Sequence, residues 1–80
     1  MTNVKLEKLI SLISKSTNIK INDLNKDSCA NDFAKWDSLA HLRIMLEIEK
    51  MYKIKISTSK MSELNSVKSI LFYLNNSAFL

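Results

Sequence analysis

Glycine and proline are both absent from this 80-residue sequence. Loops that cradle phosphate groups with backbone N–H donors depend on glycine, so the Walker and dinucleotide-binding fingerprints are excluded. Turns must be built from asparagine, aspartate, serine and lysine instead. Cysteine and histidine occur once each, as Cys29 and His41. One of each can form neither an intramolecular disulfide nor a His/Cys metal cluster. A site made of carboxylates alone stays open at this point, but the sequence has no EF-hand pattern, and we expect no metal site.

Long apolar runs are also missing from the sequence. No stretch approaches the roughly 18 residues of a membrane span. The first residues alternate charged and apolar side chains, which is unlike a signal peptide, so the expected location is the cytoplasm. The hydrophobic fraction is 46% and the mean hydropathy is −0.06, which is typical of a folded protein. We expect residues 1–80 to form one domain and a monomer.

The net charge of +4 suggests an acidic partner at first sight. The basic excess lies near the two ends of the chain, in residues 1–18 and 52–80, and it consists almost entirely of lysine. No basic motif interleaved with aromatic residues accompanies it, so we do not expect nucleic-acid binding.

Helical periodicity organises most of the chain. Leu6, Leu9, Ile10 and Ile13 follow the spacing of an amphipathic helix, which Thr2 or Asn3 can cap and which ends before Asn18. Residues 16–36 have no sustained period and predict a long loop. Four of its apolar residues are expected to hold this loop on the core: Ile19, Ile21, Leu24 and Phe33.

A second helix is predicted from about Asp37 to Tyr52, with Asp37 as its N-cap. An extended connector containing Ile54 and Ile56 follows, then a short helix capped by Ser57 or Thr58, and a final helix capped by Asn65 or Ser66. These elements predict an all-α, antiparallel four-helix bundle with three long helices, one short helix and a long loop between the first two helices. The expected buried stripe of the second helix comprises Leu39, Leu42, Met45 or Leu46, and Ile48 or Tyr52. The remaining expected core residues are Leu64, Val67, Ile70, Leu71 and Leu74, with Leu6, Leu9 and Ile13 opposite.

The dipeptide Asp-Ser occurs twice, and only Ser38 opens a periodic helix, whereas Ser28 lies in the loop. Three interpretations of Ser38 compete. It can be a structural residue of the first helical turn. It can be a nucleophile with Asp37 and His41, but the adjacent Asp37 would hardly reach the far ring nitrogen of His41, so hydrolysis is not expected. It can also be modified, because a helix N-terminus favours a phosphate ester.

The order of three strings carries a family resemblance. "DSL" opens an amphipathic helix, and "IEKMYKIKI" and then "MSELNSVKSILFYL" follow it. Over nearly the whole chain this pattern resembles the acyl carrier protein family. The resemblance implies that Ser38 carries 4′-phosphopantetheine, taken from coenzyme A by a phosphopantetheinyl transferase, with Asp37 and Leu39 completing the attachment motif. Acyl or aminoacyl groups would travel on this arm as thioesters, while an acyl-loading ligase and acyltransferase or synthase enzymes perform the chemistry. The chain itself would be no enzyme.

Lys35 and Trp36 stand before the motif, where the family often has glycine. Trp-Asp-Ser-Leu also occurs in carriers outside the main fatty-acid pathway, which implies a specialised biosynthetic pathway. The expected partner-docking residues are Trp36, Arg43, Leu46, Glu47, Glu49 and Lys50. Family members are usually acidic, whereas the charges of these residues cancel, so generic fatty-acid enzymes are expected to bind poorly and partners with a mixed-charge patch better.

Plainer interpretations remain for individual residues. Trp36 also fits a packing role in the loop beside the helix, His41 fits a surface position on the helix, and Cys29 fits an unreactive thiol. The alternative function is a small helical protein-interaction module without a prosthetic group, in which Ser38 is only a helix-capping residue.

Overall fold

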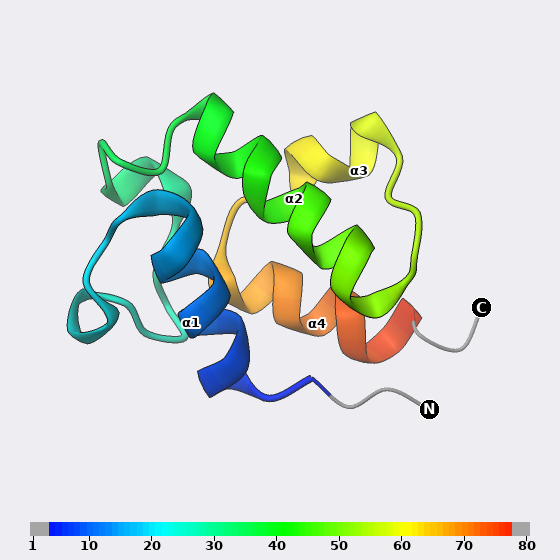
Figure 1. Ribbon diagram of the computed structural model, residues 1–80, viewed down its shortest axis with the longest axis horizontal. Helices are drawn as coiled ribbons and strands as arrows, with labels where there is room; N and C mark the ends of the chain where they lie inside the picture. Colours follow the sequence, from blue (N-terminus) through cyan, green and yellow to red (C-terminus); the bar gives the residue numbers. More distant parts are fainter. Residues whose placement is uncertain (1–3, 78–80) are drawn as a thin grey trace.

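The computed structural model describes residues 4–77, and the regular secondary-structure elements within them are all helices (Figure 1). The α-helices are α1 (Leu6–Thr17), α2 (Ser38–Tyr52), α3 (Thr58–Glu63) and α4 (Val67–Ser77). Two short 3₁₀ turns, Ile21–Asp23 and Ala30–Asp32, lie in the loop between α1 and α2. The prediction of an all-α fold with three long helices and one short helix is confirmed.

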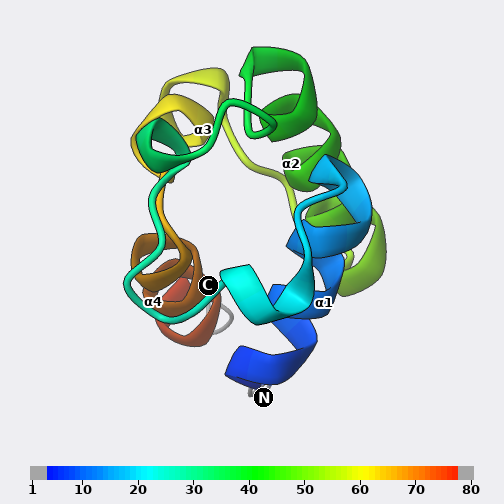
Figure 2. The same ribbon diagram turned by 90° about the vertical axis from the view of Figure 1, so that its left-hand side faces the viewer.

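The helices surround a common core. Helix α1 packs against α2 and α4. Seen almost end-on, α1 and α2 lie on one side of the molecule and α3 and α4 on the other (Figure 2). The space between them is filled by apolar side chains from every helix and from the loop. The fully buried members of this core are Leu9, Ile13, Ile44, Met45, Ile48, Val67 and Ile70.

Helix α1 ends where the sequence predicts. Asn18 adopts the left-handed conformation with φ of 65°, and its N–H donates to the carbonyl of Ser14 at 2.8 Å. Asparagine takes the place that glycine commonly fills at a helix C-terminus. The predicted N-terminal caps, Thr2 and Asn3, lie outside the described residues. Leu6 is half-buried, so its contribution to the core is smaller than predicted.

Apolar side chains from both halves of the long loop pack on the core. Ile19 and Leu24 are buried and Phe33 is half-buried, as predicted. Ile21 is exposed, so the prediction that it anchors the loop is wrong. None of the residues of the 3₁₀ turn Ile21–Asp23 is buried, whereas Ile19 and Leu24 on either side of this turn are.

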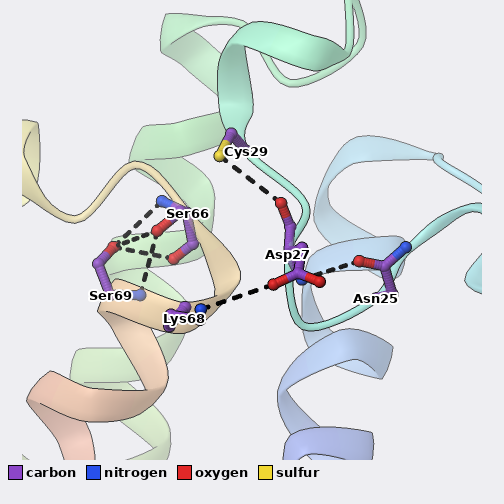
Figure 3. A network of polar contacts seen from close by, with 6 residues as sticks. All are labelled: Asn25, Asp27, Cys29, Ser66, Lys68 and Ser69. Carbon is purple, nitrogen blue, oxygen red and sulfur yellow. Dashed lines mark hydrogen bonds and ion pairs between the residues drawn. The ribbon is translucent and has the colours of Figure 1, made fainter.

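The second half of the loop is tied to the start of α4, as Figure 3 shows. The N–H of Ala30 donates to the carbonyl of Asn65 at 2.8 Å, and the N–H of Val67 donates to the carbonyl of Ser28 at 2.9 Å. Lys68 and Asp27 form an exposed ion pair at 3.6 Å beside these bonds. These contacts hold the segment before Trp36 against a helix that is distant in sequence.

Helix α2 begins and ends as predicted, but its rotation differs from the prediction. Its buried residues are Ala40, Ile44, Met45 and Ile48. The predicted stripe residues Leu39, Leu42 and Leu46 are exposed instead, and 58% of the surface of Leu39 is accessible. The helix carries apolar residues on more than one face, so a 3.6-residue period alone cannot decide which face turns inward.

The last two helices follow the sequence closely. The hydroxyl of Ser57 accepts from the N–H of Lys60 at 3.2 Å and caps α3. The hydroxyl of Ser66 accepts from the N–H of Ser69 at 3.1 Å at the start of α4 (Figure 3). Four predicted core residues are buried, namely Leu64, Val67, Ile70 and Leu74, whereas Leu71 is only half-buried.

Candidate functional site

Ser38 is the first residue of α2 and is exposed. The carboxylate of Asp37 accepts from the N–H of Ala40 at 2.8 Å, which caps the helix as predicted. By helix geometry the N–H groups of Ser38 and Leu39 have no acceptor within α2. The hydroxyl of Ser38 therefore lies at the positive end of a helix dipole, open to an approaching molecule.

The second Asp-Ser pair has a different environment. Ser28 is 5% exposed, and its hydroxyl accepts from the N–H of Asn25 at 2.9 Å. A buried, hydrogen-bonded hydroxyl in a loop tied to α4 is unsuited to modification by another enzyme. The two serines that the sequence distinguishes therefore also differ in exposure: Ser38 is exposed and Ser28 is buried.

A bridge of two hydrogen bonds connects Trp36 to Met61 through His41, which lies in the first turn of α2. The indole Nε1–H of Trp36 donates to Nδ1 of His41 at 3.0 Å. The other ring nitrogen, Nε2, lies 2.8 Å from the carbonyl oxygen of Met61 in α3. Because Nδ1 accepts from the indole, the ring proton belongs on Nε2, which donates to Met61. The neutral imidazole thus connects the loop before α2, the first turn of α2 and α3.

This bridge corrects two predictions. Trp36 is 3% exposed and belongs to the core, so it offers no surface to a partner and its assignment as a docking residue is wrong. Its packing role in the loop beside the helix is confirmed. His41 is half-buried and bonded through both ring nitrogens, which differs from the predicted surface position. The missed signal is the spacing of His41 with Ile44, Met45 and Ile48, which places it on the buried face.

No hydrolytic triad forms around Ser38. The carboxylate of Asp37 is engaged by the backbone of Ala40, and both nitrogens of His41 are engaged by Trp36 and Met61. A general base must be within hydrogen-bond reach of the hydroxyl that it activates, and His41 is used otherwise. The Ser38 hydroxyl is therefore exposed to modification by another protein but is not activated by residues of this chain.

The surface of α2 beyond Ser38 is partly apolar and partly charged. Arg43, Glu47 and Lys50 are exposed, and so is 51% of the surface of Leu46. Glu49 differs from the predicted outward position, because it is half-buried and its carboxylate accepts from the N–H of Ile56 at 2.7 Å. Its carboxylate is bonded to the connector between α2 and α3 and does not line the hollow formed by Arg43, Leu46, Glu47 and Lys50, so the four charges predicted to cancel do not all share one hollow.

Within residues 4–77, no group of three or more His, Cys, Asp or Glu side chains is placed to hold a metal ion. None of the helices in the described part of the chain is both long and apolar enough to cross a membrane.

A small helical domain that offers a serine at a helix N-terminus, with no catalytic partner beside it, has the geometry of a carrier. Two curated relatives identify the family. The chain is 33% identical over 76 residues to an acyl carrier protein of Buchnera aphidicola, which covers 95% of each chain. It is 28% identical over 68 residues to an acyl carrier protein of Onion yellows phytoplasma, covering 85% of this chain and 90% of the relative. No family model and no solved structure matches the chain. The chain belongs to the acyl carrier protein family, and its general role is that of a carrier rather than an enzyme.

Proposed function

We propose that the chain carries acyl or aminoacyl groups on a 4′-phosphopantetheine arm attached to Ser38. The observation that carries this proposal is the exposure of Ser38 at the start of α2, in a chain of the acyl carrier protein family. The buried hydroxyl of Ser28 provides the contrast, because the same dipeptide occurs there without access.

The attachment uses the Ser38 hydroxyl as the nucleophile. Its oxygen forms a bond to the phosphorus of the pantetheine phosphate in coenzyme A, and the pyrophosphate bond of coenzyme A breaks. The nucleotide half leaves, and the hydroxyl proton passes to a base of the phosphopantetheinyl transferase. Ser38 needs a base supplied by the transferase because His41 is committed to Trp36 and Met61.

The residues around Ser38 fit a phosphodiester. The positive end of the α2 dipole stabilises its negative charge, typically by 0.3–1 kcal/mol when exposed. The Asp37 carboxylate is held on the Ala40 N–H, which fixes the first turn and with it the direction of the Ser38 side chain. Leu39 lies exposed beside Ser38, where it offers an apolar contact to the transferase. When bound, the arm supplies a thiol that holds its cargo as a thioester.

The proposed setting is a specialised biosynthetic pathway in the cytoplasm. The partners are a phosphopantetheinyl transferase, an acyl-loading ligase, and acyltransferase or synthase enzymes. One support is the Trp36-Asp37-Ser38-Leu39 variant, which resembles carriers outside the main fatty-acid pathway. The other is the presence of Arg43 and Lys50 on α2, which opposes docking to enzymes built for an acidic helix.

The test is the intact mass of purified protein after incubation with coenzyme A and a promiscuous phosphopantetheinyl transferase. Wild-type protein and Ser28→Ala should each gain one phosphopantetheine group, and Ser38→Ala should gain none while keeping the same circular dichroism spectrum. A wild-type protein that gains no mass would instead favour an interaction module without a prosthetic group.

A further inference from the structure

Two adjoining hollows follow the line where α1 and α2 meet. The larger, of about 570 Å³, is lined by Lys15, Ser16, Arg43, Leu46, Glu47 and Lys50. The smaller, of about 220 Å³, shares Lys15, Ser16 and Glu47 with it and adds Lys8, Ser11, Leu12 and Met51. Because they share residues from both helices, they form one surface, which we call the α1–α2 groove.

The groove is strongly positive. Four of its lining side chains are cationic, namely Lys8, Lys15, Arg43 and Lys50, and Glu47 is its one acidic member. All five are exposed. The two ion pairs found within residues 4–77 involve Lys60 with Glu63 and Lys68 with Asp27, which lie outside the groove. Glu49 lies outside the lining of both hollows, and its carboxylate accepts from the N–H of Ile56.

The groove also presents apolar surface among these charges. About half the surface of Leu46 and of Met51 is accessible, at 51% and 49%. Leu46 lies about 12 Å along the helix axis from Ser38, at about 1.5 Å per residue. A molecule seated on Leu46 would therefore lie on the helix that bears the proposed attachment site.

We propose that the α1–α2 groove docks the partner enzymes of this carrier, and that their docking surface is acidic around an apolar residue that contacts Leu46. This inference rests on the proposed carrier function and states the chemistry of its partners. It replaces the mixed-charge partner expected from the sequence, because Lys8 and Lys15 of α1 join the face while Glu49 leaves it.

The position of Glu47 favours a protein over a polyanion. Glu47 lines both hollows, so its carboxylate would face the phosphates of a nucleic acid or of an anionic membrane at close range. Like charges at such distances are destabilising. A protein surface can place one basic residue against Glu47 and acidic residues against the four cations, and it can cover Leu46 and Met51 at the same time.

The test uses the full chain labelled with ¹⁵N and two amphipathic helical peptides with the same leucine stripe. One peptide has glutamate at its polar positions and the other has lysine. The acidic peptide should shift the amide resonances of α1 and α2 along the groove, and it should bind more tightly than the basic peptide. The binding should weaken as salt is raised, because exposed charges are screened.

The groove variant is Arg43→Glu with Lys50→Glu, and the matched control is Lys20→Glu with Lys26→Glu in the loop between α1 and α2. Both double variants change the net charge equally, and all four positions are exposed. The groove variant should lose about tenfold in affinity for the acidic peptide, whereas the control should lose much less. Lys15→Glu on α1 should also weaken binding of the acidic peptide. This variant provides an independent test in case the double variant on α2 does not fold.

Equal losses in the groove and control variants would overturn the inference, because net charge alone would then explain binding. Groove-dependent binding of phosphatidylglycerol vesicles or duplex DNA that exceeds binding of the acidic peptide would overturn it as well. The proposed carrier function is tested by a different result: it is refuted if wild-type protein gains no phosphopantetheine from coenzyme A. An arm on Ser38 with no preference for the acidic peptide would refute only the docking inference.

Discussion

Replacing His41 by alanine tests the hydrogen-bonded bridge between Trp36 and Met61. The imidazole accepts the indole N–H of Trp36 at 3.0 Å and lies 2.8 Å from the carbonyl of Met61. Since Trp36 is 3% exposed, the variant leaves a buried donor without its partner, which costs about 1–3 kcal/mol. Loss of the bond to Met61 adds about 0.5–1.5 kcal/mol. Alanine is the better helix former and returns about 0.5 kcal/mol.

We therefore expect His41→Ala to lower the free energy of unfolding by about 1–4 kcal/mol. A domain of this size has a total of roughly 4–12 kcal/mol, so the loss is large. Urea denaturation followed by far-ultraviolet circular dichroism measures it. Trp36 is the only tryptophan, so its fluorescence separately reports whether water reaches the indole.

A double-mutant cycle with Trp36→Phe separates the hydrogen bond from general packing. Phenylalanine has no N–H group that could be left without an acceptor. His41→Ala should therefore lower the free energy of unfolding by about 1–3 kcal/mol less in the Trp36→Phe background than in wild-type protein. Equal costs in the two backgrounds would refute the reasoning, because the imidazole would then act only by filling space.

Two further predictions concern the backbone and the core. Lys53 has a positive φ of 55° at the end of α2, so Lys53→Gly should raise the free energy of unfolding by about 0.5–1 kcal/mol. Lys55→Gly, in the extended connector, should lower it, and no difference between the two glycine variants in urea denaturation would contradict the argument. Ile70 is fully buried, so Ile70→Ala should cost about 2–5 kcal/mol, whereas the half-buried Leu71→Ala should cost clearly less. A larger loss for Leu71 in thermal melts would show that the face of α4 is misplaced.

The predictions that held depend on short stretches of sequence. Asp37 and Ser57 act as N-caps, and Asn18 closes α1, because each acts on backbone groups within a few residues of itself. The same locality distinguishes Ser38 from Ser28, since a periodic helix follows only the former. Helix boundaries, and the difference in exposure between Ser38 and Ser28, could therefore be predicted.

The rotation of α2 could not be predicted in the same way. Leu39, Leu42 and Leu46 are as apolar as Ile44 and Ile48, so the hydrophobic period fits two faces. The contacts that accompany the observed rotation join residues far apart in sequence, such as His41 with Met61. The charge of the proposed docking face depends on the same kind of information, because α1 contributes Lys8 and Lys15 to the hollows that it shares with α2.

Localisation of the arm is the most direct measurement of the central claim. Wild-type protein co-expressed with a phosphopantetheinyl transferase is digested, and the peptides are fragmented in a mass spectrometer. We predict that the mass of one phosphopantetheine group is found on Ser38, with Ser28 unmodified in the same sample. An arm on Ser28 or any other residue, or no arm in a sample whose control carrier is fully modified, would contradict the account.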